Sequence, residues 1–481
     1  MNKLKNVQNN TRNSLLIRSL LNEGRFFVLF ETDISQLLKH NQNPVENFQQ
    51  IRNALNSHPQ IPAGTALLNY SDRQMPPDAP ELAAQIFDHN NPDIIYLCGK
   101  AASAENIRNF LNKCICGNIT SIVPVTGNSY NFKVFKNLRK PACFDSSHTL
   151  HIIKKEFQNS ILFPGTTVNP FKYEPDILFA QYFKLIKKLN FGANFIIAQA
   201  GWDMMKYQEL RWYLNDREYN IPTAARFLFL NQSILNDIHN KKYPGIFISR
   251  DFNIILEKEN KFSRTQFEAA QWRRLQIVAA GLKLMGYSAI QIAGLTSPDK
   301  IITALNKIDE AFKEMNSFSK WLNAYSEHFS RSDMAPFKHR YYMFNNLFNE
   351  QYTDKKFKNN KTISQCSFKT KLKYFTAKKL FSQTHLLDPG EFKISKKLLM
   401  NCRSCAYCRL PLTHYICPET CPKGLANGPC GGSSVDGHCE VVEHKFCIHI
   451  KRVQIAAWLN EIDTLEERYI RHPNQAEKTK M

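Results

Sequence analysis

The sequence has no long uninterrupted apolar run. No segment approaches the roughly 18 consecutive apolar residues that a membrane-spanning helix needs. The Asn- and Lys-rich start also lacks the apolar core of a secretory signal, so we expect a cytoplasmic protein. The composition of unfolded chains is absent as well, because the 481 residues include 34 Phe and 18 Tyr and are 43% apolar. A chain of this size can bury a substantial core.

Glycine-rich phosphate-binding loops are also missing. The sequence contains neither GxGxxG nor GxxxxGK[ST]. Open, doubly wound sheets normally carry such a loop after their first strand. For a chain in which strands and helices alternate, their absence favours a closed barrel over an open sheet.

Acidic residues are scarce relative to basic ones. The chain has 63 Lys and Arg against 42 Asp and Glu, a net charge of +21. Residues 338–397 contain 14 of the basic and 4 of the acidic residues, which is about half of the excess. A positive net charge is compatible with nucleic acid, an anionic membrane or phosphorylated small molecules as partners. Both a solvated, partly disordered connector and an anion-binding surface fit this stretch.

Short apolar runs alternate with amphipathic stretches over the first 300 residues. The candidate strands are 26–31, 64–69, 93–99, 121–127, 161–168, 194–199, 226–231 and 289–295. Helical spacing of apolar residues is found in 78–87, 103–114, 175–189 and 267–285. Apolar strands without strict alternation are typical of a parallel sheet covered on both faces, and eight βα units in roughly 290 residues is the size of a TIM barrel.

Cysteine is concentrated near the end of the chain. Eight of the thirteen cysteines are Cys402, Cys405, Cys408, Cys417, Cys421, Cys430, Cys439 and Cys447. Because cytosolic thiols are kept reduced, this density indicates metal or cluster ligation rather than disulfides. The CxxCxxC start is typical of a cubane [4Fe-4S] cluster, whereas zinc is more often bound by two separated CxxC pairs. Eight thiolates suffice for two four-ligand sites, and both metals stay open.

The predicted fold class is therefore α/β, a (β/α)8 TIM barrel followed by a small Cys-rich metal-binding domain. The boundaries we predict are an N-terminal extension at 1–25, the barrel at 26–315, a helical and basic connector at 316–398, the Cys-rich domain at 399–455, and a terminal helix and tail at 456–481. Apolar residues at helical spacing predict a single last helix over 450–468.

The active site of a TIM barrel is built at the C-terminal ends of its strands. Polar residues stand at five of these ends, namely Glu31, Asn69, Gly127-Asn128, Gln199 and Asn231. A carboxyl group at an apolar barrel mouth is suited to act as a general acid, because desolvation disfavours its charged form. A solvated loop carboxylate is the alternative interpretation of Glu31.

The Cys-rich segment carries a specific resemblance. Residues 401–447 resemble the C-terminal domain associated with methylenetetrahydrofolate reductases, through the pattern CP…C-x-KGLxNGPCGG…GxCEV…C. In that family the domain is fused to a flavin-containing barrel or forms a partner subunit of it, and metal or iron–sulfur centres are attributed to it. The barrel region resembles the reductase more weakly, through Phe30-Glu31 and the GANFIIAQ segment at 192–199.

The resemblance implies an activity and a set of site residues. The activity is reduction of 5,10-methylenetetrahydrofolate to 5-methyltetrahydrofolate in one-carbon metabolism and methionine biosynthesis, with hydride supplied by a bound flavin, FAD or FMN. Glu31 corresponds to the general acid, Gln199 to the residue that contacts the folate pterin, and Lys188 to a flavin-phosphate lysine. The other expected cofactor-binding residues are Asn69, Tyr96, Thr126, Gly127 and Asn128, and Asn128 is expected to contact the substrate too.

The chain departs from the family pattern on three strands. Thr126-Gly127-Asn128 stands where the family has RGD, Tyr96 where a His is common, and Leu295-Thr296-Ser297 where LNR is expected. A non-catalytic or partner-dependent folate or iron–sulfur scaffold is therefore the alternative function, and a nucleic-acid-binding protein is the least expected. The electron donor stays open between NAD(P)H and a donor protein, and a homo-oligomer is among the expected assemblies.

Overall fold

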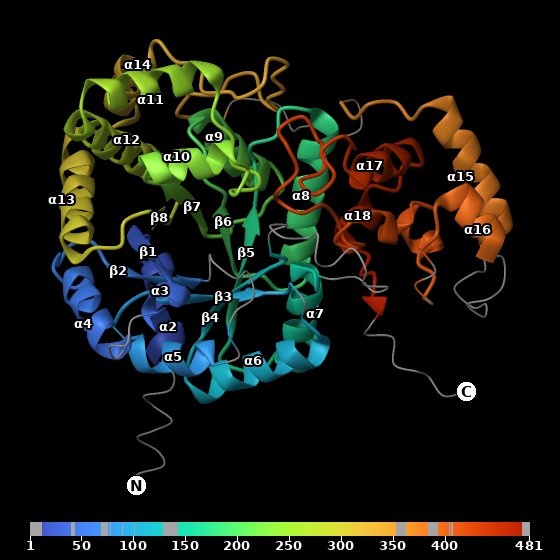
Figure 1. Ribbon diagram of the computed structural model, residues 1–481, viewed down its shortest axis with the longest axis horizontal. Helices are drawn as coiled ribbons and strands as arrows, with labels where there is room; N and C mark the ends of the chain where they lie inside the picture. Colours follow the sequence, from blue (N-terminus) through green and yellow to red (C-terminus); the bar gives the residue numbers. More distant parts are fainter. Residues whose placement is uncertain are drawn as a thin grey trace, which may run out of the picture.

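The computed structural model of the chain describes residues 12–39, 44–68, 76, 78–88, 90–100, 102–127, 143–352, 362–382, 393–403, 405 and 407–473. In this part of the chain, eight parallel strands pair in sequence order and close into a barrel (Figure 1). The strands are β1 (Phe27–Asp33), β2 (Ala63–Leu68), β3 (Ile94–Cys98), β4 (Ser121–Val125), β5 (Phe163–Val168), β6 (Phe195–Ala198), β7 (Thr223–Leu228) and β8 (Ala289–Ala293). The predicted TIM barrel is confirmed.

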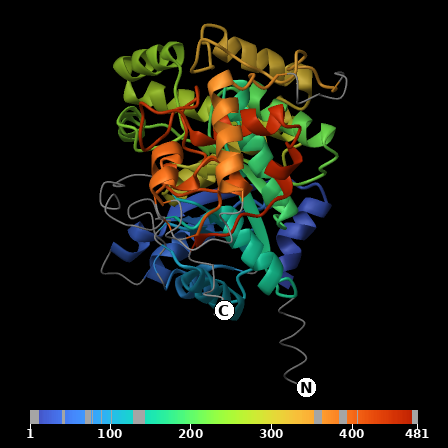
Figure 2. The same ribbon diagram turned by 90° about the vertical axis from the view of Figure 1, so that its right-hand side faces the viewer.

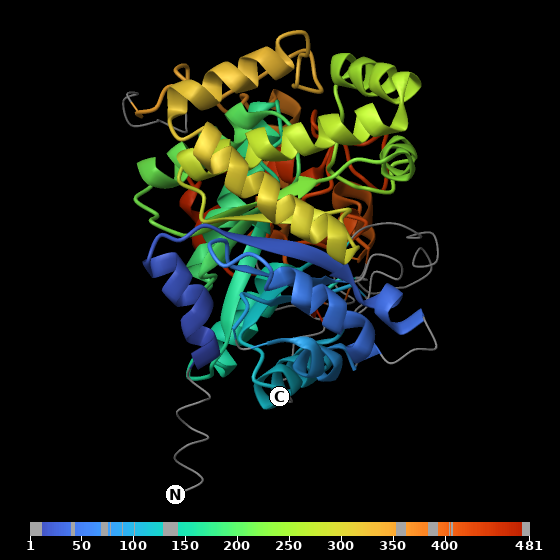
Figure 3. The same ribbon diagram turned by 90° about the vertical axis from the view of Figure 1, so that its left-hand side faces the viewer.

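Helices surround the barrel and continue beyond it. Those of the barrel region are α2 (Arg12–Asn22), α3 (Ile34–Lys39), α4 (Pro44–Leu55), α5 (Ala79–Ile86), α6 (Ala104–Cys116), α7 (Ser146–Glu156), α8 (Pro175–Asn190), α9 (Met204–Asp216), α10 (Gln232–His239), α11 (Arg250–Phe262), α12 (Arg264–Leu284) and α13 (Pro298–Glu314). They are followed by α14 (Phe318–Phe329), α15 (Phe368–Phe381), α16 (Lys393–Met400), α17 (Ile448–Trp458) and α18 (Asp463–Glu467), with short 3-10 turns η3 (Leu410–Thr413) and η4 (Pro418–Thr420). Figure 3 shows α13 crossing the side of the barrel that faces away from α15 to α18.

The strand positions agree with the sequence to within two residues, with one exception. Strand β7 begins at Thr223, three residues before the predicted start, and ends at Leu228. Asn231, expected at the end of this strand, instead caps helix α10 and accepts a hydrogen bond from the Ile234 amide. The shift places Arg226 in the middle of the strand rather than at its entrance.

The inside of the barrel is apolar at the N-terminal ends of the strands. Helix α2, from the predicted extension, packs beneath this layer through Ile17 and Leu20. The layer itself contains Phe27, Leu29, Ala66, Ile94, Val123, Phe163, Phe195, Ile197, Ala224 and Ala289. This end of the barrel is therefore a packed core, which leaves the opposite, C-terminal end for a site.

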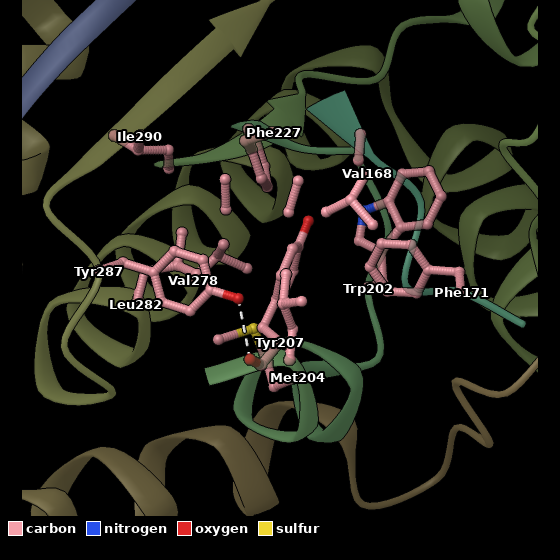
Figure 4. Close-up of a cluster of buried hydrophobic side chains, with 14 of the residues drawn as sticks. Val168, Phe171, Trp202, Met204, Tyr207, Phe227, Val278, Leu282, Tyr287 and Ile290 are labelled. Atoms are coloured by element: carbon pink, nitrogen blue, oxygen red, sulfur yellow. Dashed lines mark hydrogen bonds between the residues drawn. The ribbon is translucent and has the colours of Figure 1, made fainter. Parts of the chain in front are cut away.

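The main core lies between the strands and the outer helices. Figure 4 shows Val168, Phe171 and Phe227 facing Tyr207 and Met204 of α9. The hydroxyl of Tyr287 donates a hydrogen bond to the backbone oxygen of Tyr207, 2.8 Å away, so the polar atom of this buried ring is satisfied.

Residues 316–352, the first part of the predicted helical and basic connector, pack against the barrel core. Trp321 of α14 is fully buried and donates from Nε1 to the Ile277 oxygen at 2.9 Å. A Cβ at Gly281 would lie 2.5 Å from that indole nitrogen, so glycine makes room for the tryptophan. Further along, Tyr342 donates to Asp203 at 2.7 Å, and the Met343 amide donates to Glu209. Met343 and Phe344 are buried, so the solvated-connector interpretation is wrong for residues 338–352, the first quarter of the basic stretch.

The C-terminal domain packs against the barrel through α8. Helix α8 begins at Pro175 and ends just before Gly192, whose φ of +93° suits the reversal of the chain. Figure 1 shows α8 between the barrel and helices α17 and α18. The prediction of a single last helix is wrong, because the helix is interrupted between α17 and α18. Asn460 lies in this interruption and has a φ of +57°.

Two further helices stand at the edge of the C-terminal domain. Helices α15 and α16 lie side by side at the outer side of this domain (Figures 1 and 2). Their shared core includes Tyr374, Ala377, Phe381 and Met400. Among the described residues, no helix is both long enough and apolar enough to cross a membrane.

Candidate active site

A cavity of about 460 Å³ opens at the C-terminal ends of the barrel strands. This volume is within the range of pockets that hold drug-sized ligands. Glu31, Tyr96, Thr126, Gly127, Lys188, Gln199, Arg226 and Gln291 line it from the barrel. Lys423, Pro429, Cys430, Gly431, Gly432 and Glu440 line it from the C-terminal domain. The cavity is therefore shared by the two parts of the chain.

Glu31 is the centre of a polar network inside the barrel mouth. Its side chain is buried and forms a two-point ion pair with Arg226, with Nε–Oε1 and Nη2–Oε2 distances of 2.5 and 2.9 Å. Gln291 donates to the same Oε1 at 2.6 Å. Burial alone would lower the pKa of Arg226, but Glu31 outweighs it and raises this pKa above its usual value. Both oxygens of Glu31 are thus acceptors in this arrangement.

Gln199 and Tyr96 complete this network. The Oε1 of Gln199 accepts hydrogen bonds from Arg226 Nη1 at 3.2 Å and from the Ala200 amide at 3.0 Å. The hydroxyl of Tyr96 donates to Gln291 Oε1 at 2.9 Å. Burial and the nearby Glu31 raise the pKa of Tyr96, so the phenol remains a hydrogen-bond donor at neutral pH. Three residues predicted from the sequence are therefore brought together by Arg226 and Gln291.

Arg226 and Gln291 were missed at the sequence level. The predicted strand 226–231 begins at Arg226, and the predicted strand 289–295 contains Gln291 within AIQIAGL, so the pattern marks neither as a site residue. A signal was present, because each is the one strongly polar side chain in an otherwise apolar strand, TAARFL or AIQIA. A polar group inside a barrel needs a buried partner, and here the partner is Glu31.

Lys188 lies at the wall of the cavity, as predicted for a ligand-binding lysine. Its Nζ donates to the backbone oxygen of Thr167. Burial, together with the positive charge of Lys184, lowers the pKa of Lys188 to about 7, although Asp145 opposes this shift. Lys184 forms an ion pair with Asp145 at 2.8 Å, whereas no described carboxylate lies within salt-bridge distance of Lys188. A buried lysine without a paired anion suits an anionic ligand group.

Thr126 and Gly127 also border the cavity. Thr126 donates to Asp145 at 3.3 Å, and the Gly127 oxygen accepts a hydrogen bond from Lys423 of the C-terminal domain at 2.9 Å. Gly127 has a φ of +89°, a conformation that favours glycine. Asn69 and Asn128, both predicted as site residues, lie outside the described residues.

The loop around Cys430 is held over the barrel mouth by barrel side chains. Asn169, which follows β5, donates to the Gly431 oxygen at 2.7 Å. Gln181 of α8 donates to the Cys430 oxygen at 2.7 Å, and Lys172 donates to the Ser433 oxygen at 2.5 Å. Because these contacts go to backbone oxygens, the position of the loop is fixed without using its thiols.

None of the eight clustered cysteines forms a disulfide in the described part of the chain, and they lie in two neighbourhoods. Burial, and then the nearby Cys430, Cys421 and Cys439, raise the pKa of Cys447. Burial raises the pKa of Cys417 to about 12, with Cys405 and Cys402 adding to the effect. The donor chemistry suits zinc or an iron–sulfur cluster. Within the described ranges, however, no three such side chains converge into a metal-binding group, so we derive no chemical step through a metal.

The C-terminal domain also has a family match. Residues 386–476 match the family of the methylene-tetrahydrofolate reductase C-terminal domain. The resemblance read from the cysteine pattern is thereby confirmed for this part of the chain. The matched region contributes Lys423, Cys430 and Glu440 to the cavity wall.

Over the whole chain, the similarity to known proteins is weak. A solved structure of an uncharacterized protein from Clostridium thermocellum, described as binding two copies of 5-methyl-5,6,7,8-tetrahydrofolic acid, is 14% identical with a TM-score of 0.43. The alignment covers 62% of this chain and 99% of that one. A comparison with curated proteins gives no match. The barrel assignment therefore rests on the strand order itself.

Proposed function

We propose that the chain is a flavin-dependent reductase that converts 5,10-methylenetetrahydrofolate to 5-methyltetrahydrofolate. One observation carries the proposal. The domain that matches the methylene-tetrahydrofolate reductase C-terminal family lines the same cavity as Glu31 and Gln199 at the barrel mouth. A domain of this kind placed directly over the strand ends of a TIM barrel supports a shared role in the reaction that the barrel carries out.

In this proposal Glu31 protonates the nitrogen whose bond to the methylene carbon opens, which leaves an iminium cation on the substrate. The two oxygens of Glu31 accept hydrogen bonds from Arg226 and Gln291. Substrate must therefore displace at least one of these donors before Glu31 can hold and deliver a proton. Gln199 holds the pterin, and its contact with Arg226 couples substrate position to the ion pair.

The residues that would hold the flavin are those of the cavity wall. Lys188 provides a positive charge without a paired carboxylate, which suits a flavin phosphate. Tyr96, Thr126 and Gly127 line the adjoining wall. A bound flavin, FAD or FMN, supplies the hydride that reduces the methylene carbon. The electron donor is NAD(P)H or a donor protein.

The cysteine neighbourhoods of the C-terminal domain complete the proposal. We propose that they hold an iron–sulfur cluster or zinc, because eight cysteines within residues 402–447 of the sequence provide enough thiols for either metal. Metal binding would also stabilise this small domain, since binding of a structural metal contributes folding free energy.

The experiment is an absorption spectrum with metal analysis of the full chain, purified without oxygen. The proposal predicts the flavin bands of a yellow protein together with bound iron or zinc. A Lys188→Met variant is expected to retain less flavin than the wild type, while Lys258→Met, on the exposed surface of α11, is expected to retain as much. Full-chain protein with no flavin, even after incubation with excess FAD or FMN, would contradict the proposal.

A second candidate is a folate-binding scaffold without catalysis, and the Glu31–Arg226 ion pair favours it. A carboxylate held at two points by a guanidinium is a poor proton donor. Such a scaffold would bind 5-methyltetrahydrofolate but would not form it. Folate binding in the absence of any flavin would support this candidate over the reductase.

A further inference from the structure

Helix α15 is apolar on two opposite sides. At about 100° per residue, Tyr374, Ala377 and Phe381 fall on one side, where they are buried against the C-terminal domain. Phe368, Leu372 and Phe375 fall on the opposite side at i, i+4 and i+7, with exposed fractions of 81%, 57% and 56%. One apolar side explains how the helix packs. Most of the other side faces solvent, although the Phe375 ring also meets Trp458 edge to face, with centroids 5.4 Å apart.

Lysines border the exposed apolar side on both flanks. The same geometry places Lys371 and Lys378 along one flank and Lys369 and Lys373 along the other. Helix α15 contains no acidic residue, and no described carboxylate lies within salt-bridge distance of these lysines. Partial burial, and then the nearby Lys451 and Lys369, lower the pKa of Lys373, so positive charges crowd each other here.

Helix α16, which packs against α15 through a shared core, also has exposed apolar side chains. Leu398 is 82% exposed and Leu399 is also exposed, next to Lys397. Six of the nine large apolar side chains that are exposed among the described residues belong to α15 or α16. We call the surface formed by these residues the basic apolar face; it comprises Phe368, Lys369, Lys371, Leu372, Lys373, Phe375, Lys378, Lys397 and Leu398. Figure 2 shows both helices on the outer side of the molecule.

We propose that the basic apolar face binds the surface of an anionic lipid bilayer. Exposed Phe and Leu side chains can enter the boundary between headgroups and acyl chains, while flanking lysines keep their ammonium groups near the anionic headgroups. A protein partner would need hollows shaped to receive Phe368 and Leu398, which are more than four-fifths exposed. A bilayer adapts to such side chains without a preformed shape. The proposal does not depend on the reaction in the barrel.

The first test is sedimentation of the full chain with lipid vesicles. Vesicles of equal parts phosphatidylglycerol and phosphatidylcholine are expected to bind it at least about tenfold more tightly than pure phosphatidylcholine vesicles, and added salt is expected to weaken this binding. The double variant Phe368→Ser/Leu372→Ser is expected to bind the anionic vesicles about tenfold more weakly than the wild type. Phe262→Ser is the matched control, because Phe262 of α11 is also 81% exposed but lies on the barrel.

Charge is tested separately. Lys369→Glu/Lys373→Glu replaces two positive charges of the basic apolar face with two negative ones. It is expected to weaken vesicle binding at least about tenfold, since each lysine near the surface contributes about 1 kcal/mol. Lys258→Glu/Lys261→Glu makes the same change of charge on the exposed part of α11 and is expected to bind as the wild type does. Thermal unfolding of each variant checks that it is folded.

Three results would overturn the proposal. The first is no binding of the wild type to the anionic vesicles at low salt, and the second is unchanged binding by Phe368→Ser/Leu372→Ser. The third is assignment of the face to another partner. If the wild type forms dimers that dissociate in this double variant, and does not bind vesicles, the face is a dimer interface. If the wild type retains tRNA with a steep salt dependence, and does not bind vesicles, the face binds nucleic acid.

Discussion

Glu31 and Arg226 come from strands that are far apart in sequence but close across the barrel. The pair is buried and hydrogen-bonded at two points, and Gln199 and Gln291 extend it to four strands. Such a pair resists the loss of one member, because the remaining charge has no partner and little water. The same residues are therefore expected to affect both stability and chemistry.

Glu31→Gln separates the two half-reactions of the proposed enzyme. Reduction of 5,10-methylenetetrahydrofolate is expected to be abolished, because the amide cannot supply the proton that opens the ring. Reduction of the flavin by its electron donor is expected to continue, since that step does not need this proton. Stopped-flow absorbance of the flavin measures both steps, and equal loss of both would exclude Glu31 as the acid.

Arg226→Leu is expected to lower the free energy of unfolding by about 3 kcal/mol, because it leaves the buried Glu31 carboxylate without its partner. The double variant Glu31→Gln/Arg226→Leu removes the orphaned charge and is expected to recover at least about 1 kcal/mol relative to additive behaviour. Denaturant unfolding of the four proteins measures this coupling. Strict additivity would show that the ion pair does not form in solution.

Lys188 gives stability a defined pH dependence. Its folded-state pKa, lowered to about 7 mainly by burial, lies below the value of 10.5 expected for an exposed lysine. Between these values the unfolded chain binds more protons, so stability is expected to rise with pH. Compared with Lys188→Met, the flavin-free wild type is expected to gain about 2 kcal/mol from pH 7.5 to pH 9.5. Parallel curves for the two proteins would contradict this assignment.

Single residues were predictable from sequence where a motif marked them. Glu31 and Lys188 were found because their neighbours matched a pattern, and both line the cavity. Arg226 was not found, because a three-residue error at the start of β7 hid the direction of its side chain. The i, i+4 spacing places Lys184 next to Lys188. The sequence pattern could not reveal that both are buried, because their burial depends on contacts between α8 and the C-terminal domain.

At the scale of elements, helix α8 connects the barrel site to the C-terminal domain. Gln181 and Lys184 donate to backbone oxygens of residues 428–430, and Lys187 donates to the Arg468 oxygen at 2.8 Å. Near the start of β7, Arg217 forms a two-point ion pair with Glu466 of α18 at 3.0 and 2.6 Å. These contacts explain why a helix with three lysines is almost entirely buried.

Two glycines of the loop over the barrel mouth are expected to respond differently to substitution. Gly428 has a φ of +132°, and a Cβ there would lie 2.9 Å from the Lys184 side chain, so Gly428→Ala is expected to cost about 1–3 kcal/mol. A Cβ at Gly431 would meet only the Asn169 side chain at 3.6 Å, so Gly431→Ala is expected to change stability by less than about 0.5 kcal/mol. Thermal unfolding compares them, and equal effects would contradict the described loop position.

Elements were predictable where hydrophobic periodicity was strong. All eight strands and helices such as α8 and α12 lie close to their predicted positions. The end of helix α17 could not be predicted, because the apolar spacing continues past Asn460. Hydrophobic periodicity does not indicate that Asn460 has a left-handed backbone conformation, which ends the helix. The role of α2 was also hidden, since its packing under the barrel depends on closure of all eight strands.

At the scale of the whole molecule, the C-terminal domain forms part of the wall of the barrel cavity. The sequence predicted both parts and their order, because each has its own composition and spacing. Their docking could not be predicted, since it rests on long-range hydrogen bonds from Asn169, Gln181 and Lys423 to backbone oxygens. Such contacts leave no periodic signal in a single sequence.

The central claim is that this shared cavity reduces 5,10-methylenetetrahydrofolate. The most direct measurement is a single turnover without oxygen, in which the flavin of the full chain is first reduced and then mixed with this substrate. The account predicts that the oxidised flavin spectrum returns and that an equal amount of 5-methyltetrahydrofolate forms. A flavin that stays reduced while folate is bound would contradict the claim and favour the scaffold.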